Sequence, residues 1–410
     1  MEYGKLRVFV TAERNSLPIE GAVIRITNEN EPENTIEQTT TDSSGKTADI
    51  ELPAPPVEYS MEPGANKPYA EYTIYIEAPG YETVEINGAE IMSGEVAIQN
   101  KGLLPIIKED ENSAELFVIP DHTLWGDYPP KIIEPEIKPV NESGEIVLSR
   151  VVIPEYVVVH DGPPSDSAAE NYYVGYKDYI KNVASSEIYA TWPRETIIAN
   201  ILAIQSFTLN RVYTEFYRNR GYDFTITSST AYDHKWIPGR NIFDSISEVV
   251  DSVFTDFLSR PNVSQPILTQ YCDGKRVTCP GVMSQWGSKA LGDQGYSAIG
   301  ILQNYYGNTI FINSTETISG IPSSWPGTDL SIGSRGDKVR QLQNQLNVIA
   351  EGYPLIPVIA ADGIYGEATA NAVRVFQRIF DLPETGITDF PTWYKISEIY
   401  VGVSRIAEYV

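Results

Sequence analysis

Two glutamates that lie eight residues apart could carry acid–base chemistry in this chain. Glu187 is expected beside Ile188, Tyr189 and Trp192, a half-apolar place, and Glu195 in the first turn of the next helix. A carboxyl group in such half-apolar surroundings holds its proton more readily, so it can protonate a leaving oxygen and later take a proton back. We favour Glu187 for this role; the alternatives are Glu195 and neither residue.

The only two cysteines form a second group with chemical potential. Six residues around an Asp-Gly turn separate Cys272 from Cys279, a spacing compatible with a hairpin that brings the sulfurs together. Three interpretations stay open: a loop-closing disulfide, a free thiol pair, and a zinc site with His234 and Asp273 as the nearest further ligands. A thiol nucleophile with a histidine base is conceivable, but nothing else in the sequence supports a peptidase.

Helical periodicity indicates which elements position the two glutamates. Apolar residues at helical spacing predict a first helix from residue 176 towards Glu187. A second helix should begin near Trp192 and place Glu195 in its first turn, where the helix dipole also gives a carboxylate a purely structural role. A third helix is predicted over residues 242–257.

The chain as a whole is predicted to be multidomain. An all-β sandwich occupies residues 1–105, where short alternating runs are separated by turn residues. A Pro-rich, acidic connector with some strand content follows at 106–165, then a central α+β domain at 166–315. A linker at 316–329 leads to a small three-helix domain at 330–410.

Charge and hydropathy exclude two classes of partner. The 410 residues include 30 Lys and Arg against 55 Asp and Glu, a net charge of −25, which would repel a nucleic-acid backbone. No apolar run approaches the roughly 18 residues of a membrane span, so we expect no transmembrane segment. The first residues show neither the basic nor the apolar region of a secretion signal, and the export route stays open.

The C-terminal residues carry the most specific pattern. Its motifs are G-S-R-G-D-K-V at 333–339, L-Q at 342–343, L-N at 346–347, D-G-I-Y-G at 362–366, A-V at 372–373, F-Q at 376–377, T-G at 385–386 and T-W at 392–393. This order resembles the peptidoglycan-binding domain at the ends of many cell-wall hydrolases, and the resemblance implies wall binding without chemistry. Asp362, Tyr365 and Trp393 are candidate groove residues, although loop capping and core packing explain each equally well.

The central region carries a second set of motifs. They are V-G-Y-K-D-Y-I-K-N-V-A-S-S-E at 174–187, W-P-R-E-T-I-I-A-N-I-L-A at 192–203, S-Q-W-G-S-K-A-L-G-D-Q-G-Y at 284–296 and I-L-Q-N-Y-Y-G at 301–307. Their order resembles the stage II sporulation protein D family, also called amidase-enhancer domains, over about 140 residues. The resemblance implies substrate contacts by His234, Gln285, Trp286 and Tyr305.

That family resemblance implies lytic transglycosylase activity on peptidoglycan strands already stripped of stem peptides. The C6 hydroxyl of N-acetylmuramic acid closes onto its own C1 and leaves a 1,6-anhydro end, with no water consumed. One carboxylic acid, Glu187 in our interpretation, serves both proton transfers, and no cofactor is required.

The N-terminal sandwich resembles a third family. L-P-I-E-G-A-V at 17–23, T-T-D-S-S-G at 40–45 and E-A-P-G-Y at 77–81 are similar to the carboxypeptidase regulatory-like, transthyretin-type sandwich. That resemblance implies an accessory or adhesive module without catalysis.

Together these patterns predict a modular cell-wall or spore-associated protein. Its expected partners are peptidoglycan glycan strands and a wall amidase that supplies stripped strands. The favoured function is a lytic transglycosylase held on the wall by its C-terminal domain. One alternative is a non-catalytic wall-binding or amidase-modifying protein, which is favoured by departures from the family pattern at 198–206. The other is a structural component of a spore or phage-like particle.

Overall fold

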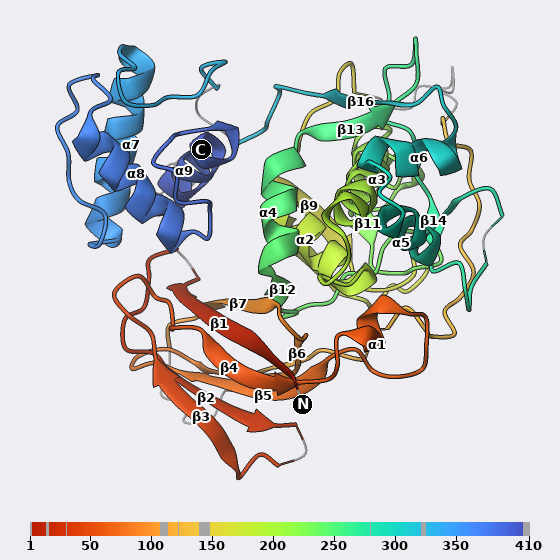
Figure 1. Cartoon of the computed structure of the whole chain (residues 1–410), viewed down its shortest axis with the longest axis horizontal. Coiled ribbons are helices and arrows are strands. Elements are labelled where there is room, and N and C mark those ends of the chain that lie inside the picture. Colours follow the sequence, from red (N-terminus) through yellow and green to blue (C-terminus); the bar gives the residue numbers. More distant parts are fainter. Residues whose placement is uncertain are drawn as a thin grey trace.

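The computed structural model describes residues 2–13, 16–29, 31–106, 114–121, 123–138, 148–278, 280–320 and 325–404. A β-rich N-terminal part, a mixed α/β centre and a helical C-terminal part follow one another along the chain (Figure 1). The predicted multidomain fold class is therefore confirmed. None of the helices in these ranges has the length and apolarity that a membrane crossing requires.

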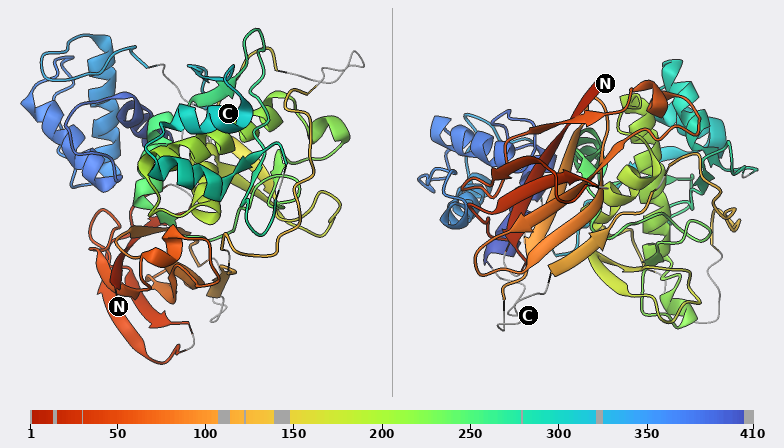
Figure 2. Two further views of the ribbon diagram at one scale, coloured as in Figure 1. Left: turned by 45° about the vertical axis from the view of Figure 1, so that its right-hand side comes forward. Right: turned by 90° about the horizontal axis from the view of Figure 1, so that it is seen from below.

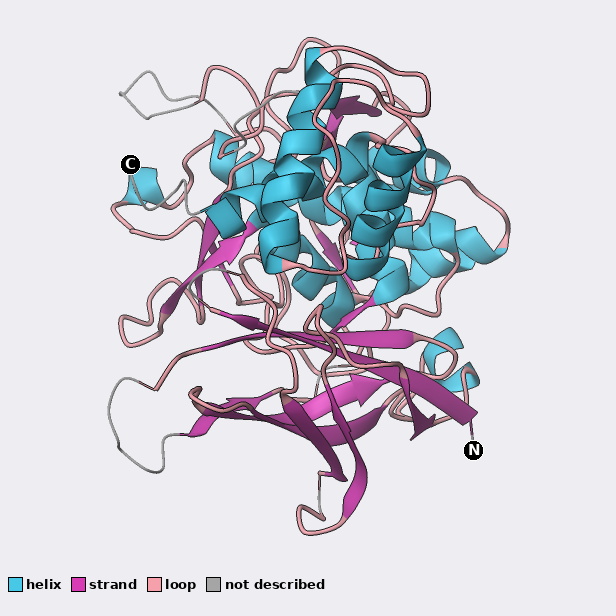
Figure 3. Cartoon of the chain, turned by 90° about the vertical axis from the view of Figure 1, so that its left-hand side faces the viewer, coloured by secondary structure: helices cyan, strands magenta, loops and turns pink. Residues whose placement is uncertain are grey.

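The N-terminal part is a sandwich of two sheets, which lie below the helices in Figure 3. The first sheet has the order β12 (Ile242–Phe243), β7 (Val96–Leu103), β1 (Glu2–Ala12) and β4 (Ile50–Ala54). The second has the order β3 (Thr35–Thr40), β2 (Val23–Asn28), β5 (Ala70–Glu77), β6 (Thr83–Ile91) and β8 (Ala114–Val118), and a short helix α1 (Glu58–Met61) follows β4. The alternating residues Leu6, Val8 and Val10 of β1 are fully buried, as period-two patterning predicts.

Two strands of this sandwich come from outside the predicted range 1–105. β8 pairs in parallel with β6, so the second sheet extends into the predicted connector. β12 pairs with β7 through Ile242 and Phe243, which were predicted as the start of the third helix. Because the edge of β7 takes up their backbone groups, the helix α4 (Asp244–Val253) begins later than predicted. It also ends earlier, because strand β13 (Asp256–Ser259) follows it.

The central part is built around α3 (Arg194–Tyr213), of which sixteen of the twenty residues are buried. Such all-round burial is typical of a helix in the middle of a core. The helices packed against it are α2 (Tyr176–Glu187), α4, α5 (Gln285–Asp293) and α6 (Ala298–Tyr306). The remaining elements are β9 (Tyr156–His160), β10 (Asn171–Gly175), β11 (Ile226–Thr227), β14 (Tyr271–Cys272), β15 (Met283–Ser284), β16 (Phe311–Ser314) and the 3-10 turn η1 (Arg218–Arg220).

The C-terminal part consists of the three predicted helices, α7 (Asp337–Gly352), α8 (Glu367–Ile379) and α9 (Phe390–Ser404). The apolar stripe of α7, which includes Leu342 and Leu346, is fully buried against its neighbours. These helices lie beside both other parts of the molecule (Figure 2).

Charged contacts join the three parts to one another. Asp381 accepts from Arg7 and Lys46 of the sandwich, both at 2.6 Å. Glu398 on α9 pairs with Lys177 on α2 at 2.9 Å. These contacts give the C-terminal helices a defined orientation relative to the centre and the sandwich.

Candidate functional site

Glu187 is the last residue of α2, the position that the periodicity predicted, and its side chain is buried. One carboxylate oxygen accepts the backbone N–H of Lys235. Burial raises the pKa of Glu187, and the nearby ammonium of Lys131, the phenol of Tyr271 and the Lys235 N–H oppose that rise. A buried carboxyl whose pKa is raised in this way suits proton donation to a leaving group.

The carboxyl of Glu187 borders a cavity of about 50 Å³, which we call the Glu187 pocket. Its walls come from four regions: residues before β9, the end of α2, the loop after β11, and the segments around β14 and α5. The lining residues are Leu124, Tyr128, Pro129, Lys131, Glu187, Thr230, Tyr271, Cys272, Asp273, Val277 and Gln285. Pockets that bind small molecules usually hold about 300–1,000 Å³, so this one has room only for a few waters.

Gln285 is the predicted contact residue that lines this pocket. It is the first residue of α5, and its amide donates to the main-chain carbonyl of Glu187 at 2.8 Å. The helix start is fixed by Ser284, whose hydroxyl accepts the N–H of Gly287 at 2.9 Å. Gln285 therefore holds the main chain that carries the acid.

His234 lies behind the pocket wall and does not face open space. It is fully buried, its Nδ1 lies 3.0 Å from the hydroxyl of Tyr179, and its ring stacks on Tyr271 at 5.7 Å. Burial, and then the charges of Lys131 and Arg211, hold the pKa of His234 well below its usual range. In this structure the side chain of His234 is part of the core, and its contact with substrate stays a prediction.

Trp286 and Tyr305 are also packing residues here. The indole of Trp286 is buried, lies 5.1 Å from the ring of Trp192, and donates to the carbonyl of Leu124 at 3.0 Å. Tyr305 on α6 is half-buried against α5, where a Cβ on Gly287 would lie 2.1 Å from its hydroxyl. Neither side chain lines the Glu187 pocket.

Glu195 has a structural role that accounts for its position. It lies in the first turn of α3, as predicted, and its side chain is exposed. Its carboxylate accepts the N–H of Ala298, the first residue of α6, at 2.6 Å. A carboxylate there satisfies a free N–H of the helix end and complements the helix dipole. Of the two glutamates, only Glu187 lines the pocket.

A buried charge network beside the pocket was not predicted. The guanidinium of Arg211 is fully buried, and it donates to Asp233 at 2.8 Å and to both oxygens of Glu134 at 2.6 and 3.1 Å. Asp233 also accepts from the hydroxyl of Tyr217 at 2.6 Å. The signal in the sequence was Arg211 between Leu209 and Val212, two apolar residues of the predicted helix, since a buried charge requires a partner.

The structure supports the disulfide interpretation for Cys272. Cys272 is disulfide-bonded, and the only other cysteine in the chain is Cys279, which itself lies outside the described residues. A disulfide-bonded Cys272 is neither a free thiol nor a thiolate ligand of zinc. Among the described residues, no group of three or more His, Cys, Asp or Glu side chains is arranged to hold a metal ion.

We expect reduction of this disulfide to weaken the pocket wall formed by Cys272, Asp273 and Val277. Closing so short a loop stabilises a fold by about 2–3 kcal/mol when the native geometry is unstrained. Treatment with a thiol reductant should therefore increase amide exchange over residues 271–278 while leaving α7 and α8 unchanged. Equal exchange in both redox states would contradict a stabilising role.

The predicted wall-binding residues are mostly internal. Tyr365 and Trp393 are fully buried, and the hydroxyl of Tyr365 donates to the carbonyl of Gly386 at 3.0 Å. Asp362 accepts the N–H of Ile364 at 2.8 Å and so fixes its own turn. Loop capping and core packing account for all three residues. Exposed large apolar side chains among the described residues of this part are Ile332, Leu355, Val358, Ile364 and Ile387.

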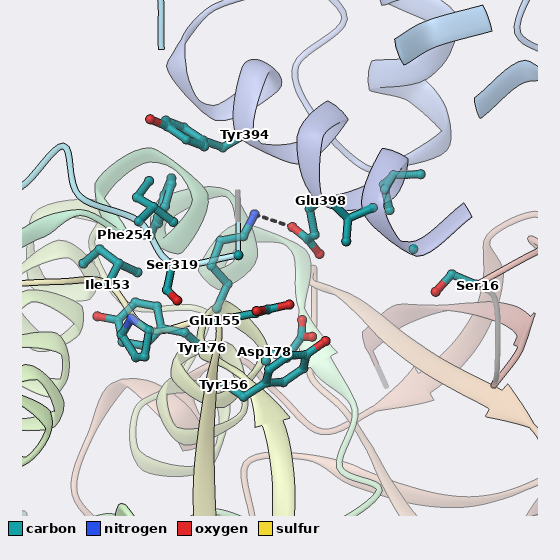
Figure 4. Close-up of a pocket in the computed structure, with 18 of the residues that line it drawn as sticks. Ser16, Ile153, Glu155, Tyr156, Tyr176, Asp178, Phe254, Ser319, Tyr394 and Glu398 are labelled. Atoms are coloured by element: carbon teal, nitrogen blue, oxygen red, sulfur yellow. Dashed lines mark ion pairs between the residues drawn. The ribbon is translucent and has the colours of Figure 1, made fainter. Parts of the chain in front are cut away.

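A larger cavity of about 420 Å³ lies where the three parts of the molecule meet. Figure 4 shows its acidic side chains, among them Glu155, Asp178 and Glu398, together with Tyr156 and the ion pair of Glu398. None of the predicted site residues lines it. The larger cavity and the predicted acid are thus separate features.

Comparison with known proteins gives a family match for the C-terminal part. Residues 335–396 match the family described as "Putative peptidoglycan binding domain". The sporulation protein D resemblance of the central part finds no corresponding family match.

One curated relative is the zinc D-Ala-D-Ala carboxypeptidase of Streptomyces albus G, 42% identical over 77 residues. The match covers 18% of this chain and 28% of that protein, so this chain spans less than a third of the length of the relative. The peptidoglycan-binding domain supports association with the cell wall.

Solved structures resemble the chain only weakly. The Bacillus anthracis TIE protein has a TM-score of 0.18 at 20% identity, over 26% of this chain and 17% of that one. The 5-hydroxyisourate hydrolase of Klebsiella pneumoniae has a TM-score of 0.17 at 13% identity, over 25% and 91%. The minor pilin GBS52 of Streptococcus agalactiae has a TM-score of 0.19 at 13% identity, over 27% and 48%. Likeness at this level carries no argument about function.

Proposed function

We propose that this protein is a wall-bound lytic transglycosylase that cleaves peptidoglycan glycan strands between N-acetylmuramic acid and N-acetylglucosamine. The observation that carries the proposal is a buried glutamate, Glu187, with a raised pKa, at a pocket in a chain that also bears a peptidoglycan-binding domain. The disulfide at Cys272 fits a protein that works in an oxidising compartment outside the cell membrane.

The reaction needs two proton transfers by one group. The protonated Glu187 gives its proton to the glycosidic oxygen as the bond from that oxygen to C1 of the muramic sugar breaks. The C6 hydroxyl then bonds to C1, and its proton returns to the carboxylate of Glu187. Between the two transfers the carboxylate is stabilised by the N–H of Lys235.

The direct test is a digest of purified peptidoglycan with the full chain, read by mass spectrometry. Half of the substrate is first treated with an amidase that removes stem peptides. Products that end in 1,6-anhydro-muramic acid would support the proposal, with more product from the stripped strands. Ends that have taken up water would identify a hydrolase instead and would overturn the proposed reaction.

The rate should also fall as pH rises. The reaction begins with protonated Glu187, and burial holds the pKa of that carboxyl above its usual range. Activity should therefore be full below the raised pKa and be lost as pH increases through it. The rate of cleavage of stripped strands, measured as a function of pH, tests the direction of this change. A rate that rises over the same pH range would contradict the acid role.

A second candidate is a wall-binding protein without catalysis. The small volume of the Glu187 pocket favours it, because no sugar ring fits there in the described conformation. This candidate predicts that the chain sediments with peptidoglycan but produces no new ends from either substrate. The same digest therefore separates the two functions.

A further inference from the structure

Residues 123–138 run along the central part and cover Glu187; we call this segment the strap. Four of the residues that line the Glu187 pocket belong to it: Leu124, Tyr128, Pro129 and Lys131. The segment was predicted to be a connector. It instead contributes a large share of the wall around the candidate acid.

Lys131 brings a positive charge of the strap to the site. Its side chain is buried, and its ammonium donates to the carbonyl of Asp233. It lies 5.3 Å from the ring centre of Tyr271, which also lines the pocket, and its charge acts on Glu187. A lysine of the strap thus occupies space and supplies charge where the oxygen of a bound glycan would have to approach the acid.

The strap is attached mainly through polar contacts. The N–H of Ile132 donates to Ala231 at 2.8 Å, the N–H of Lys138 donates to the Gln265 side chain at 3.0 Å, and Glu136 receives two bonds from Arg260 at 2.6 and 2.8 Å. Individual contacts of this kind contribute little net stability, since water replaces them when they open. Glu134 differs, because it pairs with the buried guanidinium of Arg211 at 2.6 Å and so is an anchor of the strap.

Apolar side chains of the strap add little to its attachment. Ile132, Ile133 and Ile137 are 46%, 58% and 37% exposed. Leu124 is the exception, because it is buried beside Trp286 and its N–H donates to the hydroxyl of Tyr189 at 2.9 Å. Apart from Leu124 and the pair of Glu134 with Arg211, lifting the strap would break mainly exposed polar contacts and would expose little additional apolar surface.

We infer that the strap is an autoinhibitory segment, which must leave the Glu187 pocket before a glycan strand can reach the acid. This inference rests on the proposed function. It accounts for a cavity of about 50 Å³ beside the candidate acid of an enzyme whose substrate is a polysaccharide. The docked strap gives a latent state, and a stripped glycan strand competes with it for the same space.

Two variants of the full chain loosen the strap without changing Glu187. Ile132→Pro removes the N–H that bonds Ala231, at an exposed side chain, and Glu136→Gln weakens the pair with Arg260. Each should increase the initial rate on soluble stripped strands by roughly two- to tenfold, because the open fraction rises by that factor. Glu384→Gln weakens a surface pair with Arg378 far along the chain and is the matched control, with no change in rate expected.

A second measurement does not depend on turnover. In the Glu187→Gln variant, amide exchange over residues 123–138 should increase when amidase-stripped glycan strands are added. If strands increase exchange although no variant cleaves, the proposed reaction fails and the strap inference stands. If the wild type cleaves while both loosened variants are no faster and strands leave exchange unchanged, the strap is a fixed wall and the inference is overturned.

Discussion

Glu187→Gln is expected to abolish formation of anhydro ends, with a loss of at least about 100-fold in rate. Glutamine keeps an oxygen that accepts the N–H of Lys235, so the backbone around the site should not move. What it lacks is the proton that the glycosidic oxygen requires. The measurement is the initial rate of anhydro product from stripped strands, for variant and wild type at equal concentration.

Glu195→Gln is the matched control, because the same substitution falls eight residues away on a carboxylate that only caps α6. It should retain activity within about twofold and lower the melting temperature slightly, as weakened caps do. Glu187→Gln should not lower it, since burial disfavours the charged form of Glu187. Equal losses of activity in the two variants would show that neither glutamate is specifically the acid.

The second large effect concerns the buried ion pair between the sandwich and the central part. Arg240 donates to both oxygens of Glu90 at 2.8 and 2.6 Å, and both side chains are about 1% exposed. Arg240 also donates to the carbonyl of Ser185, two residues before the candidate acid. Arg240→Met should lower the free energy of unfolding by about 3–5 kcal/mol, because it leaves a buried carboxyl without its cation.

The reciprocal substitution Glu90→Met should cost more. Glu90 can take up a proton when its partner is lost, and burial already raises its pKa against the effect of Arg240. The guanidinium cannot release its proton. The double variant should be more stable than either single variant, since it leaves no unpaired buried charge.

Urea unfolding of the three proteins tests this order. Glu384→Gln, which weakens an exposed pair, should change the free energy of unfolding by no more than about 0.5 kcal/mol. Additive losses in the double variant would mean that the two side chains stabilise the fold independently.

Local periodicity predicted much of the fold. The helix that ends at Glu187, the first turn that contains Glu195 and the three C-terminal helices all follow from apolar residues at helical spacing. β12 did not follow, because Ile242 and Phe243 continue a helical pattern. Only a partner strand about 140 residues earlier makes them a strand.

The site was predictable only in part, for a related reason. Helix periodicity placed Glu187 beside apolar residues, and its burial agrees with that prediction. Lys131 and Tyr271 could not be assigned, because long-range packing of the strap and of β14 brings them to the acid. Trp286 and His234 were expected at the substrate, but aromatic side chains fill cores as readily as they bind sugars.

The contacts of Asp381 and Glu398 bear on how the protein would move along a wall. A binding domain on a loose tether lets a catalytic domain sweep through a sphere around its anchor point. Here two cations of the sandwich hold Asp381, and Lys177 of the centre holds Glu398. Under the proposed function, the distance and direction from the anchor to the acid would then be fixed. Cuts would fall at a set distance and on one side of the point of attachment.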